Sequence, residues 1–207
     1  MPIDIHPSAD EFSAKFNVFS VPALLANPAL APEGPGVYVA LMPDGVEFLA
    51  RWGYFKFDQR MPSVINGHPI LYAGMSSLCG VRHRIDNHAR GDSRVSTLRM
   101  TLGALLRKNL ALAAITVPKK TYFHFGDREA HLSTWIRQNL MFGFHSCSNP
   151  AQLERHVIRN GVCPLNISER RAHPFSRHLM AIRHEMIVDA RRIQPATAAN
   201  LEAMESG

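Results

Sequence analysis

The 207-residue sequence predicts a single α+β domain. Three observations predict this fold class. The composition, with 46% hydrophobic and 19% charged residues, is ordinary for a globular protein. Strand-like apolar runs come first and end near residue 73, whereas helical periodicity dominates afterwards. No internal repeat or low-complexity block divides the chain, so one structural unit is expected.

The first third of the chain predicts one short helix and three strands. The helix covers about 20–26, and a loop follows it through Pro35. Two apolar runs then flank the turn Pro43-Asp44-Gly45, which predicts a β-hairpin. The predicted strands are 36–41, 46–50 and 70–73. The aromatic, irregular residues before the third strand have the composition of an insertion.

The middle of the chain predicts two helices and then mixed elements. Leu78, Val81 and Ile85 form a stripe at helical spacing. Ser96 or Thr97 is expected to cap the next helix, which carries a series of leucines. The later elements are a strand over 121–125, a helix over 127–138 and a strand over 140–145.

Two more helices are predicted in the last third. Asn149 is a capping residue, and Pro150 suits the first helical position. This helix is expected to end near Gly161. The last helix covers about 174–191, and the tail beyond Pro195 is expected to fray.

The cations are the most informative part of the composition. The formal net charge is +6, the sequence pI is near 9.6, and arginine far outnumbers lysine. The arginines cluster at 82–107 and 155–192. Because arginine binds phosphate oxygens bidentately, such a surface predicts a polyanionic partner, above all nucleic acid. A generally arginine-rich composition is the alternative explanation.

The sequence also bounds the location of the protein. No stretch approaches the roughly 20 apolar residues of a membrane helix, and the first residues lack a signal-peptide pattern. Cys79, Cys147 and Cys163 lie far apart, which disfavours a disulfide framework or a zinc site. We therefore expect a cytoplasmic protein with reduced thiols and no membrane contact.

Two strands and one helix carry residues suited to chemistry. Gly36-Val37-Tyr38 opens the first strand, and Tyr72-Ala73-Gly74 ends the third. Arg84 and His88 lie four residues apart on the following helix and share one face. Taken singly, tyrosines in strands are mostly core or rim residues, and Arg–His pairs on helices are mostly solvated.

Two further residues complete an ordered set. Glu154 follows Leu153 on a later helix, and Asn166 ends the run Pro164-Leu165-Asn166. The five landmarks, in this order and with the steps from 84 to 88 and from 154 to 166, resemble the GIY-YIG nuclease family. The resemblance covers roughly 34–168.

A closer resemblance extends to stand-alone bacterial members of the family. It rests on Ser96-Thr97-Leu98-Arg99, Leu102-Gly103, Leu132-Ser133-Thr134-Trp135 and His173-Pro174-Phe175. Three departures from the family pattern are visible. Residues 42–69 lengthen the spacing between the motif tyrosines, Met75 stands where many members have lysine, and Ser77-Leu78-Cys79-Gly80 adds residues before the motif arginine. None of these changes removes a residue of the core set.

The resemblance implies a fold and domain limits. It implies a small mixed or antiparallel sheet flanked by helices, with insertions and an extra C-terminal helix. The expected units are an N-terminal extension (1–35), the nuclease domain (36–168, with an insertion at 42–69), a C-terminal helix packed on the domain (169–194) and a flexible tail (195–207).

The resemblance also implies catalytic roles. Glu154 would hold Mg²⁺ or Mn²⁺, which acts as a Lewis acid on the phosphate. Arg84 would stabilise charge that develops on the phosphate oxygens. Tyr38 would take a proton from the attacking water, with its pKa lowered by Arg84, the metal and a protonatable His88. Tyr72 and His88 would position the water or relay the proton.

Residues around this set have expected roles too. Asn166 would organise the glutamate helix or the water ligands of the metal. The remaining histidines lack metal-ligand spacing, so zinc is disfavoured. His173-Pro174-Phe175 is expected to dock the last helix rather than to face DNA. The predicted phosphate contacts are Arg90, Arg94, Arg99 and Arg107, because they follow the active-site helix.

The sequence therefore predicts a Mg²⁺-dependent DNA endonuclease, with restriction or defence as one role. Cutting both strands with one site per chain favours a homodimer or sequential nicking. Three alternatives remain: a catalytically silent nucleic-acid-binding protein on the same fold, a repair or mobile-element nuclease, and a toxin nuclease. The enzyme is favoured over the silent protein because a binding protein needs no acid such as Glu154 beside phosphate.

Overall fold

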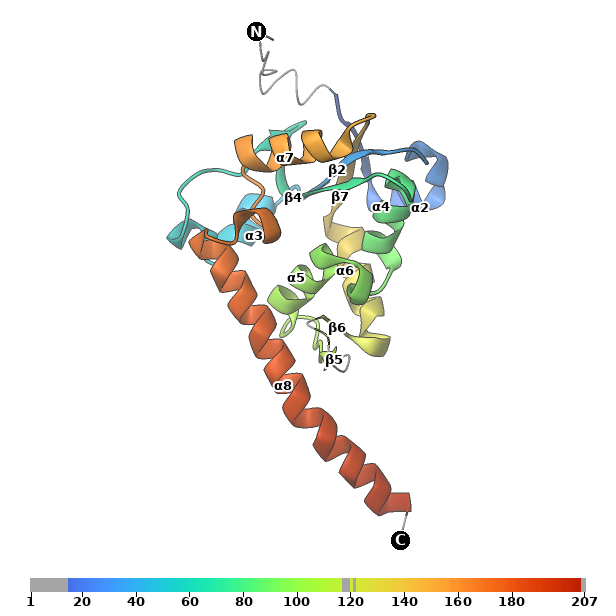
Figure 1. The fold of residues 1–207 in the computed structure, drawn as a ribbon, viewed down its shortest axis with the longest axis vertical. Coiled ribbons are helices and arrows are strands. Elements are labelled where there is room, and N and C mark those ends of the chain that lie inside the picture. Colours follow the sequence, from blue (N-terminus) through green and yellow to red (C-terminus); the bar gives the residue numbers. More distant parts are fainter. Residues whose placement is uncertain (1–14, 117–119, 121, 206–207) are drawn as a thin grey trace.

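A five-stranded antiparallel sheet forms the centre of the protein, and helices cover both of its faces (Figure 1). The computed structural model describes residues 15–116, 120 and 122–205, with side chains through residue 192. The strand order is β1-β7-β2-β4-β3. The strands are β1 (Asn17–Ser20), β2 (Gly36–Leu41), β3 (Val64–Ile65), β4 (His68–Ser76) and β7 (Met141–Ser146). This architecture confirms the predicted α+β class.

Seven α-helices lie in the described part of the chain. They are α2 (Val21–Ala26), α3 (Gly45–Arg51), α4 (Gly80–Arg90), α5 (Thr97–Leu106), α6 (Glu129–Asn139), α7 (Pro150–Asn160) and α8 (Pro174–Glu205). Helix α7 lies on one face of the sheet, and α4 lies on the other with α5 and α6 beneath it (Figure 1). Short connecting pieces are the 3-10 helices Pro28–Leu30, Tyr54–Lys56, Ser93–Val95, Gly126–Arg128 and Ser168–Arg170, and the ribbon of β5 (Ile115–Thr116) with β6 (Phe123–His124).

The central strand β2 separates two hydrophobic cores, because its side chains alternate between the faces of the sheet. Its odd-numbered residues, Val37 to Leu41, pack in one core with Val157 and Ile158 of α7. Tyr38 lies in the other core, with Val81 of α4. All six residues of β2 are buried, since the strand pairs with β4 on one side and β7 on the other.

The predicted caps of α5 and α7 are confirmed. Ser96 Oγ accepts a hydrogen bond from the backbone N–H of Arg99 at 3.1 Å, and Asn149 Oδ1 accepts one from Gln152 at 3.3 Å. Ser20 caps α2 in the same manner. These side chains satisfy backbone donors that the first turn of a helix leaves unpaired.

The predicted hairpin at 46–50 is wrong, because these residues form helix α3 and β2 pairs with β4 and β7 instead. The backbone N–H of Phe48 bonds to the carbonyl of Asp44, as in a helical turn. Phe48, Leu49 and Trp52 stand at helical spacing, and the rings of Phe48 and Trp52 lie 6.4 Å apart. A short apolar run is compatible with both the strand and the helix period, and packing against the core favours the helix here.

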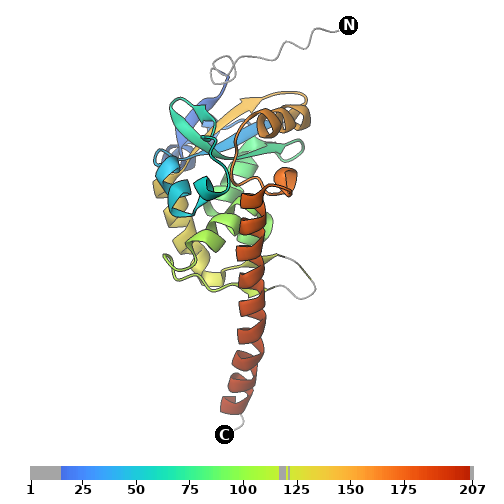
Figure 2. The ribbon, with the colours of Figure 1, turned by 90° about the vertical axis from the view of Figure 1, so that its left-hand side faces the viewer.

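Two other element limits differ from the prediction. The segment 17–20 forms edge strand β1, paired with β7, within what was expected to be an N-terminal extension. Helix α8 continues to Glu205, past the expected end near Arg191, and its last turns project away from the domain (Figures 1 and 2). No helix in the described residues combines the length and hydrophobicity needed to span a bilayer.

Residues of the long segment before β4 are held by a buried carboxylate. Asp58 accepts hydrogen bonds from Arg60 at 2.8 Å and Arg170 at 3.3 Å, and His173 Nε2 lies 3.0 Å from it. The Arg60 hydrogen bond is the main reason that the pKa of Asp58 lies below its usual value. Phe175 is buried next to this cluster, at the start of α8. These contacts agree with the predicted docking of His173-Pro174-Phe175.

Candidate active site

A buried tyrosine–histidine pair lies between β2 and α4. His88 has no exposed surface, and its Nε2 lies 2.8 Å from the hydroxyl of Tyr38. Its other ring nitrogen, Nδ1, lies 2.6 Å from Ser96 Oγ. The ring of Phe142 on β7 stacks against the imidazole at 5.9 Å. Both ring nitrogens therefore have fixed partners, which holds the imidazole against Tyr38.

The two motif glycines lie where backbone and side chain approach closely. Gly74 faces Tyr38 across the β2–β4 pair, and a Cβ at Gly74 would come within 2.4 Å of the Tyr38 hydroxyl oxygen. A Cβ at Gly36 would come within 2.5 Å of the His145 carbonyl oxygen. Tyr72, two residues before Gly74, lies on the same face, with its ring 6.5 Å from that of Tyr38.

Gly74→Ala is expected to displace Tyr38 and to reduce the nuclease activity that the resemblance implies by about 10²-fold or more, since a 1 Å misplacement has such an effect in an active site. Gly34→Ala is the matched control, because a Cβ at Gly34 has open space around it. Activity and the melting temperature of both variants measure the effect. Equal activity in the two variants would show that the close approach of Gly74 to Tyr38 is not required for activity.

Two charged side chains lie near the Tyr38–His88 pair, Arg84 on a helix of one face of the sheet and Glu154 on a helix of the other. Arg84 lies on α4 one turn before His88, and Glu154 lies on α7 next to the buried stripe of that helix. The charges of both side chains act on the pKa values of Tyr38 and Tyr72, and Arg84 acts on that of Glu154. The side chains of Tyr38, Tyr72, Arg84, His88 and Glu154 thus lie close enough for their charges to affect one another's pKa values.

The pKa values overturn one expectation about charge. Burial raises the pKa of Tyr38 above its usual value, although the Arg84 guanidinium opposes this. Burial, with the charges of Arg84 and Arg99, lowers the pKa of His88 to about 3. The idea that a protonated His88 lowers the pKa of Tyr38 is therefore wrong, because the buried imidazole is neutral near pH 7.

Asn166 lies at the free edge of β4 and pairs with the backbone there. Its Oδ1 accepts a hydrogen bond from Ala73 N at 2.8 Å, and its Nδ2 donates to Ala73 O at 2.7 Å. The neighbouring Leu165 N donates to Leu71 O at 2.8 Å. The side chain is buried and takes the place of a pairing strand next to Tyr72. These contacts hold the backbone of β4 beside Tyr72, and the side chain of Asn166 has both of its polar atoms engaged there.

Arg99 is not a phosphate contact, which corrects the prediction. It is fully buried and ion-paired with Glu129 Oε2 at 2.6 Å, and it also donates to the His88 carbonyl at 3.0 Å and to Ser133. Its backbone N–H donates to Ser96 Oγ, the cap of α5. Arg107 pairs with Glu185 and Asp189 of α8, whereas Arg90 and Arg94 lie on the surface in pairs with Asp86 and Asp92.

Arg99→Met is expected to lower the free energy of unfolding by about 3–5 kcal/mol, because it leaves the Glu129 carboxylate without its buried partner. Arg94→Met is the control, since it removes an ion pair that is exposed to solvent and therefore screened. Chemical denaturation measures both. A loss below that of the control would show that Glu129 is relieved by its remaining partners, the backbone N–H groups of Ser93 and Phe125.

Glu154 is the carboxylate of this neighbourhood that could bind a metal ion. Burial, reinforced by the charge of Glu169, raises its pKa, and no ion pair engages it among the described residues. The described residues include no cluster of three or more His, Cys, Asp and Glu ligands. Magnesium does not require one, since it keeps water ligands and binds proteins through one or two carboxylates. The hard oxygen of Glu154 fits that ion.

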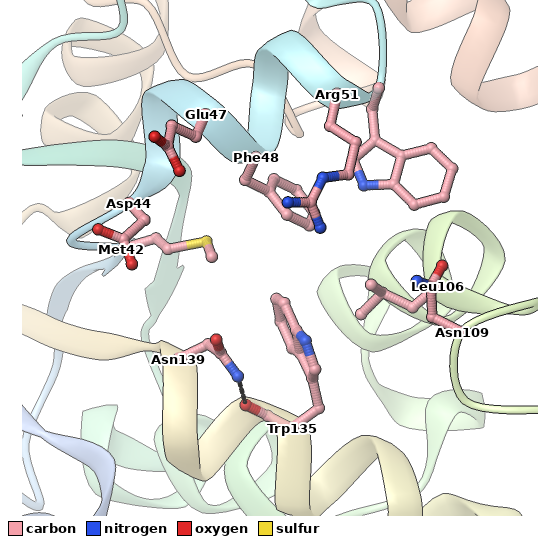
Figure 3. Close-up of a pocket in the computed structure, with 10 residues that line it drawn as sticks. Met42, Asp44, Glu47, Phe48, Arg51, Leu106, Asn109, Trp135 and Asn139 are labelled. Atoms are coloured by element: carbon pink, nitrogen blue, oxygen red, sulfur yellow. Dashed lines mark hydrogen bonds between the residues drawn. The ribbon is translucent and has the colours of Figure 1, made fainter.

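Sequence reasoning missed two contacts of this site. Ser96 was recognised as a helix cap, but its contact with His88 is tertiary and has no local signal. Glu169 acts on Glu154 from the short helix before α8. A separate pocket of about 190 Å³ between α3, α5 and α6 is lined by Phe48, Arg51 and Trp135 among others, and contains none of the predicted site residues (Figure 3).

Comparison with known proteins gives the family. A family model described as the GIY-YIG catalytic domain matches residues 36–185, which is most of the chain and includes every predicted catalytic residue. Its range ends within α8, beyond the expected domain limit at 168. Comparisons with curated proteins and with solved structures gave no match. The five converging side chains and this match lead to one conclusion: the chain belongs to the GIY-YIG family, with a nuclease catalytic domain at 36–185.

Proposed function

We propose that this protein is a divalent-metal-dependent DNA endonuclease, with Mg²⁺ or Mn²⁺ as its cofactor. One observation carries the proposal: side chains from four separate elements, β2, β4, α4 and α7, act on one another at a single place. Tyr38 and His88 form the buried part of this site. Tyr72, Arg84 and Glu154 are partly exposed, so a substrate would meet them first.

Arg84 is proposed to contact the non-bridging oxygens of the scissile phosphate. A fixed guanidinium stabilises the negative charge that grows there in the transition state, and its effect is stronger in a partly desolvated site than in water. Arg84 is suited to this because its side chain has no ion pair among the described residues; its guanidinium donates hydrogen bonds to the Tyr38 hydroxyl and, at 3.5 Å, to the Val95 carbonyl.

Tyr38 and Tyr72 are proposed to handle the proton of the attacking water. The phenolate of Tyr38 takes the proton, and the water oxygen forms its bond to phosphorus. The bond to the 3′ oxygen breaks with its electron pair on that oxygen, which then takes a proton from solvent. Tyr72, closer to solvent, orients the water. A bound Mg²⁺ at Glu154 would supply Lewis-acid stabilisation of the phosphate and leaving oxygen, and positive charge that favours the phenolate.

The surface arginines Arg90 and Arg94 are proposed as non-specific phosphate contacts. The biological role that we propose is restriction or defence, in a cytoplasmic protein that cuts as a homodimer or by successive nicks. Residues 42–69 and α8 would then contribute to DNA recognition. The two segments lie against each other, since the rings of Tyr54 and Phe175 are 5.1 Å apart, and Arg170 and His173, just before α8, bind Asp58.

Incubation of the purified protein with plasmid and genomic DNA tests the proposal. Discrete fragments in Mg²⁺ or Mn²⁺ and none in EDTA are expected for a restriction-type enzyme. Nicks confined to damaged or branched DNA would indicate repair, and smears would indicate a non-specific nuclease such as a toxin. Binding without cleavage under every metal condition would contradict the enzyme and favour a silent DNA-binding protein.

A further inference from the structure

The contact between His88 and Ser96 bears on which nitrogen of the His88 imidazole carries the hydrogen atom. Three polar groups form a buried line: Ser96 Oγ, the imidazole of His88 and the Tyr38 hydroxyl, joined at 2.6 Å and 2.8 Å. Ser96 and His88 have no exposed surface, and Tyr38 is 1% exposed. Water therefore does not reach the two inner contacts, and each hydrogen atom in them needs a protein acceptor.

Ser96 has one hydroxyl hydrogen and two acceptor sites. Its Oγ already accepts the backbone N–H of Arg99, as the cap of α5. The described residues offer its hydrogen one acceptor within reach, which is His88 Nδ1. If Nδ1 carried the proton instead, the serine hydrogen would be buried without an acceptor, and such an orphaned donor is costly. In the Nε2–H form no such orphan arises, because the hydroxyl of Tyr38 has the Tyr72 hydroxyl as its hydrogen-bond partner.

We propose that Ser96 is a positioning residue that holds His88 in the Nε2–H form, so that the imidazole donates a hydrogen bond to the Tyr38 oxygen and cannot take its proton. This inference rests on the proposed function and deepens it. His88 then stabilises the phenolate of Tyr38 while gaining and losing no proton itself. The proton of the attacking water ends on Tyr38, not on a histidine relay.

The groups around the pair agree with this assignment. Complete burial, reinforced by the charges of Arg84 on α4 and Arg99 on α5, lowers the pKa of His88, so the imidazole remains a neutral donor. The other ionisable groups that act on Tyr38 are Tyr72 on β4 and Glu154 on α7. The Arg99 guanidinium also binds the His88 carbonyl and Glu129 of α6, which fixes the backbone of α4 beside Ser96.

Three substitutions at one position separate hydrogen-bond direction from helix capping. Ser96→Thr keeps the hydroxyl and the cap. Ser96→Asp keeps the cap but can only accept, so it should turn His88 into the Nδ1–H form and leave Nε2 as an acceptor. Ser96→Ala removes both functions. Ser20→Ala is the matched control, because it deletes the cap of another helix without contact to the site.

The tautomer is measured directly by ¹⁵N NMR of the imidazole, in full-length protein without metal or DNA. We expect a protonated Nε2 in the wild type, in Ser96→Thr and in Ser20→Ala, and a protonated Nδ1 in Ser96→Asp. Single-turnover cleavage should fall about 10²-fold in Ser96→Asp, the scale of a lost acid–base arrangement, and its pH profile should move to higher pH. Ser96→Thr should keep the wild-type profile.

The outcomes distinguish this inference from the proposed function. A protonated Nδ1 in the wild type would overturn the inference whether or not the protein cuts DNA. A reversed tautomer in Ser96→Asp with wild-type rate and pH profile would overturn the positioning role and leave the nuclease intact. A wild type with the expected tautomer that cuts no DNA would overturn the proposed function, and with it the catalytic part of this inference.

Discussion

Glu154→Gln is expected to reduce cleavage by about 10³-fold or more while DNA binding stays the same or becomes tighter. The amide has nearly the shape of the carboxylate but no charge, so it cannot hold a divalent cation. Lewis-acid stabilisation of a phosphate is worth several kcal/mol, and each 1.36 kcal/mol is a factor of about ten in rate. Binding improves because a negative charge next to the DNA phosphate is removed.

The comparison should be made with Glu169→Gln, which removes the neighbouring acid by the same chemical change. Glu169 is exposed and acts on Glu154 only through its charge. Its substitution is expected to leave most of the activity. Single-turnover rates across a Mg²⁺ titration and filter-binding isotherms measure both effects. Wild-type turnover in Glu154→Gln would contradict a metal site at this residue.

The parts of the fold that local chemistry determines could be predicted from the sequence. Asn149 and Pro150 mark the start of α7, and Ser96 marks the start of α5, because capping depends on residues within one turn. The pairing of β2 with β4 and β7 could not be predicted in this way. It depends on which apolar segments share a core. Helix α3 shows that a short apolar run does not by itself distinguish a strand from a helix.

In the candidate site, too, local spacing could be predicted from the sequence, whereas burial could not. Spacing along one helix places Arg84 and His88 on one face, and the ordered motifs name Tyr38, Tyr72 and Glu154. Burial cannot be read from spacing. Arg99 was expected on the DNA-facing surface, yet it is fully buried against Glu129, 30 residues further along the chain. The neutrality of His88 has the same origin, since it follows from complete burial.

Arg84→Ala is expected to lower the single-turnover rate by about 10³-fold with little change in DNA affinity. A cation that stabilises only the developing charge contributes to the transition state and not to ground-state binding. Removal of an arginine with this role in phosphoryl transfer costs about 10³–10⁵ in rate. Arg84→Lys is expected to recover only part of the loss, because an ammonium lacks the planar fork that contacts two phosphate oxygens.

Arg90→Ala, on the same helix, provides the contrast, because Arg90 is exposed and paired with Asp86 rather than placed near Tyr38. Its loss should weaken binding to all sequences, reduce the salt slope of log K by about one unit and leave the rate at saturating protein unchanged. Rates and isotherms measured across salt for both variants separate the two roles. If saturating protein restores the full rate to Arg84→Ala, then Arg84 binds DNA in the ground state, and transition-state stabilisation must come from the metal at Glu154 alone.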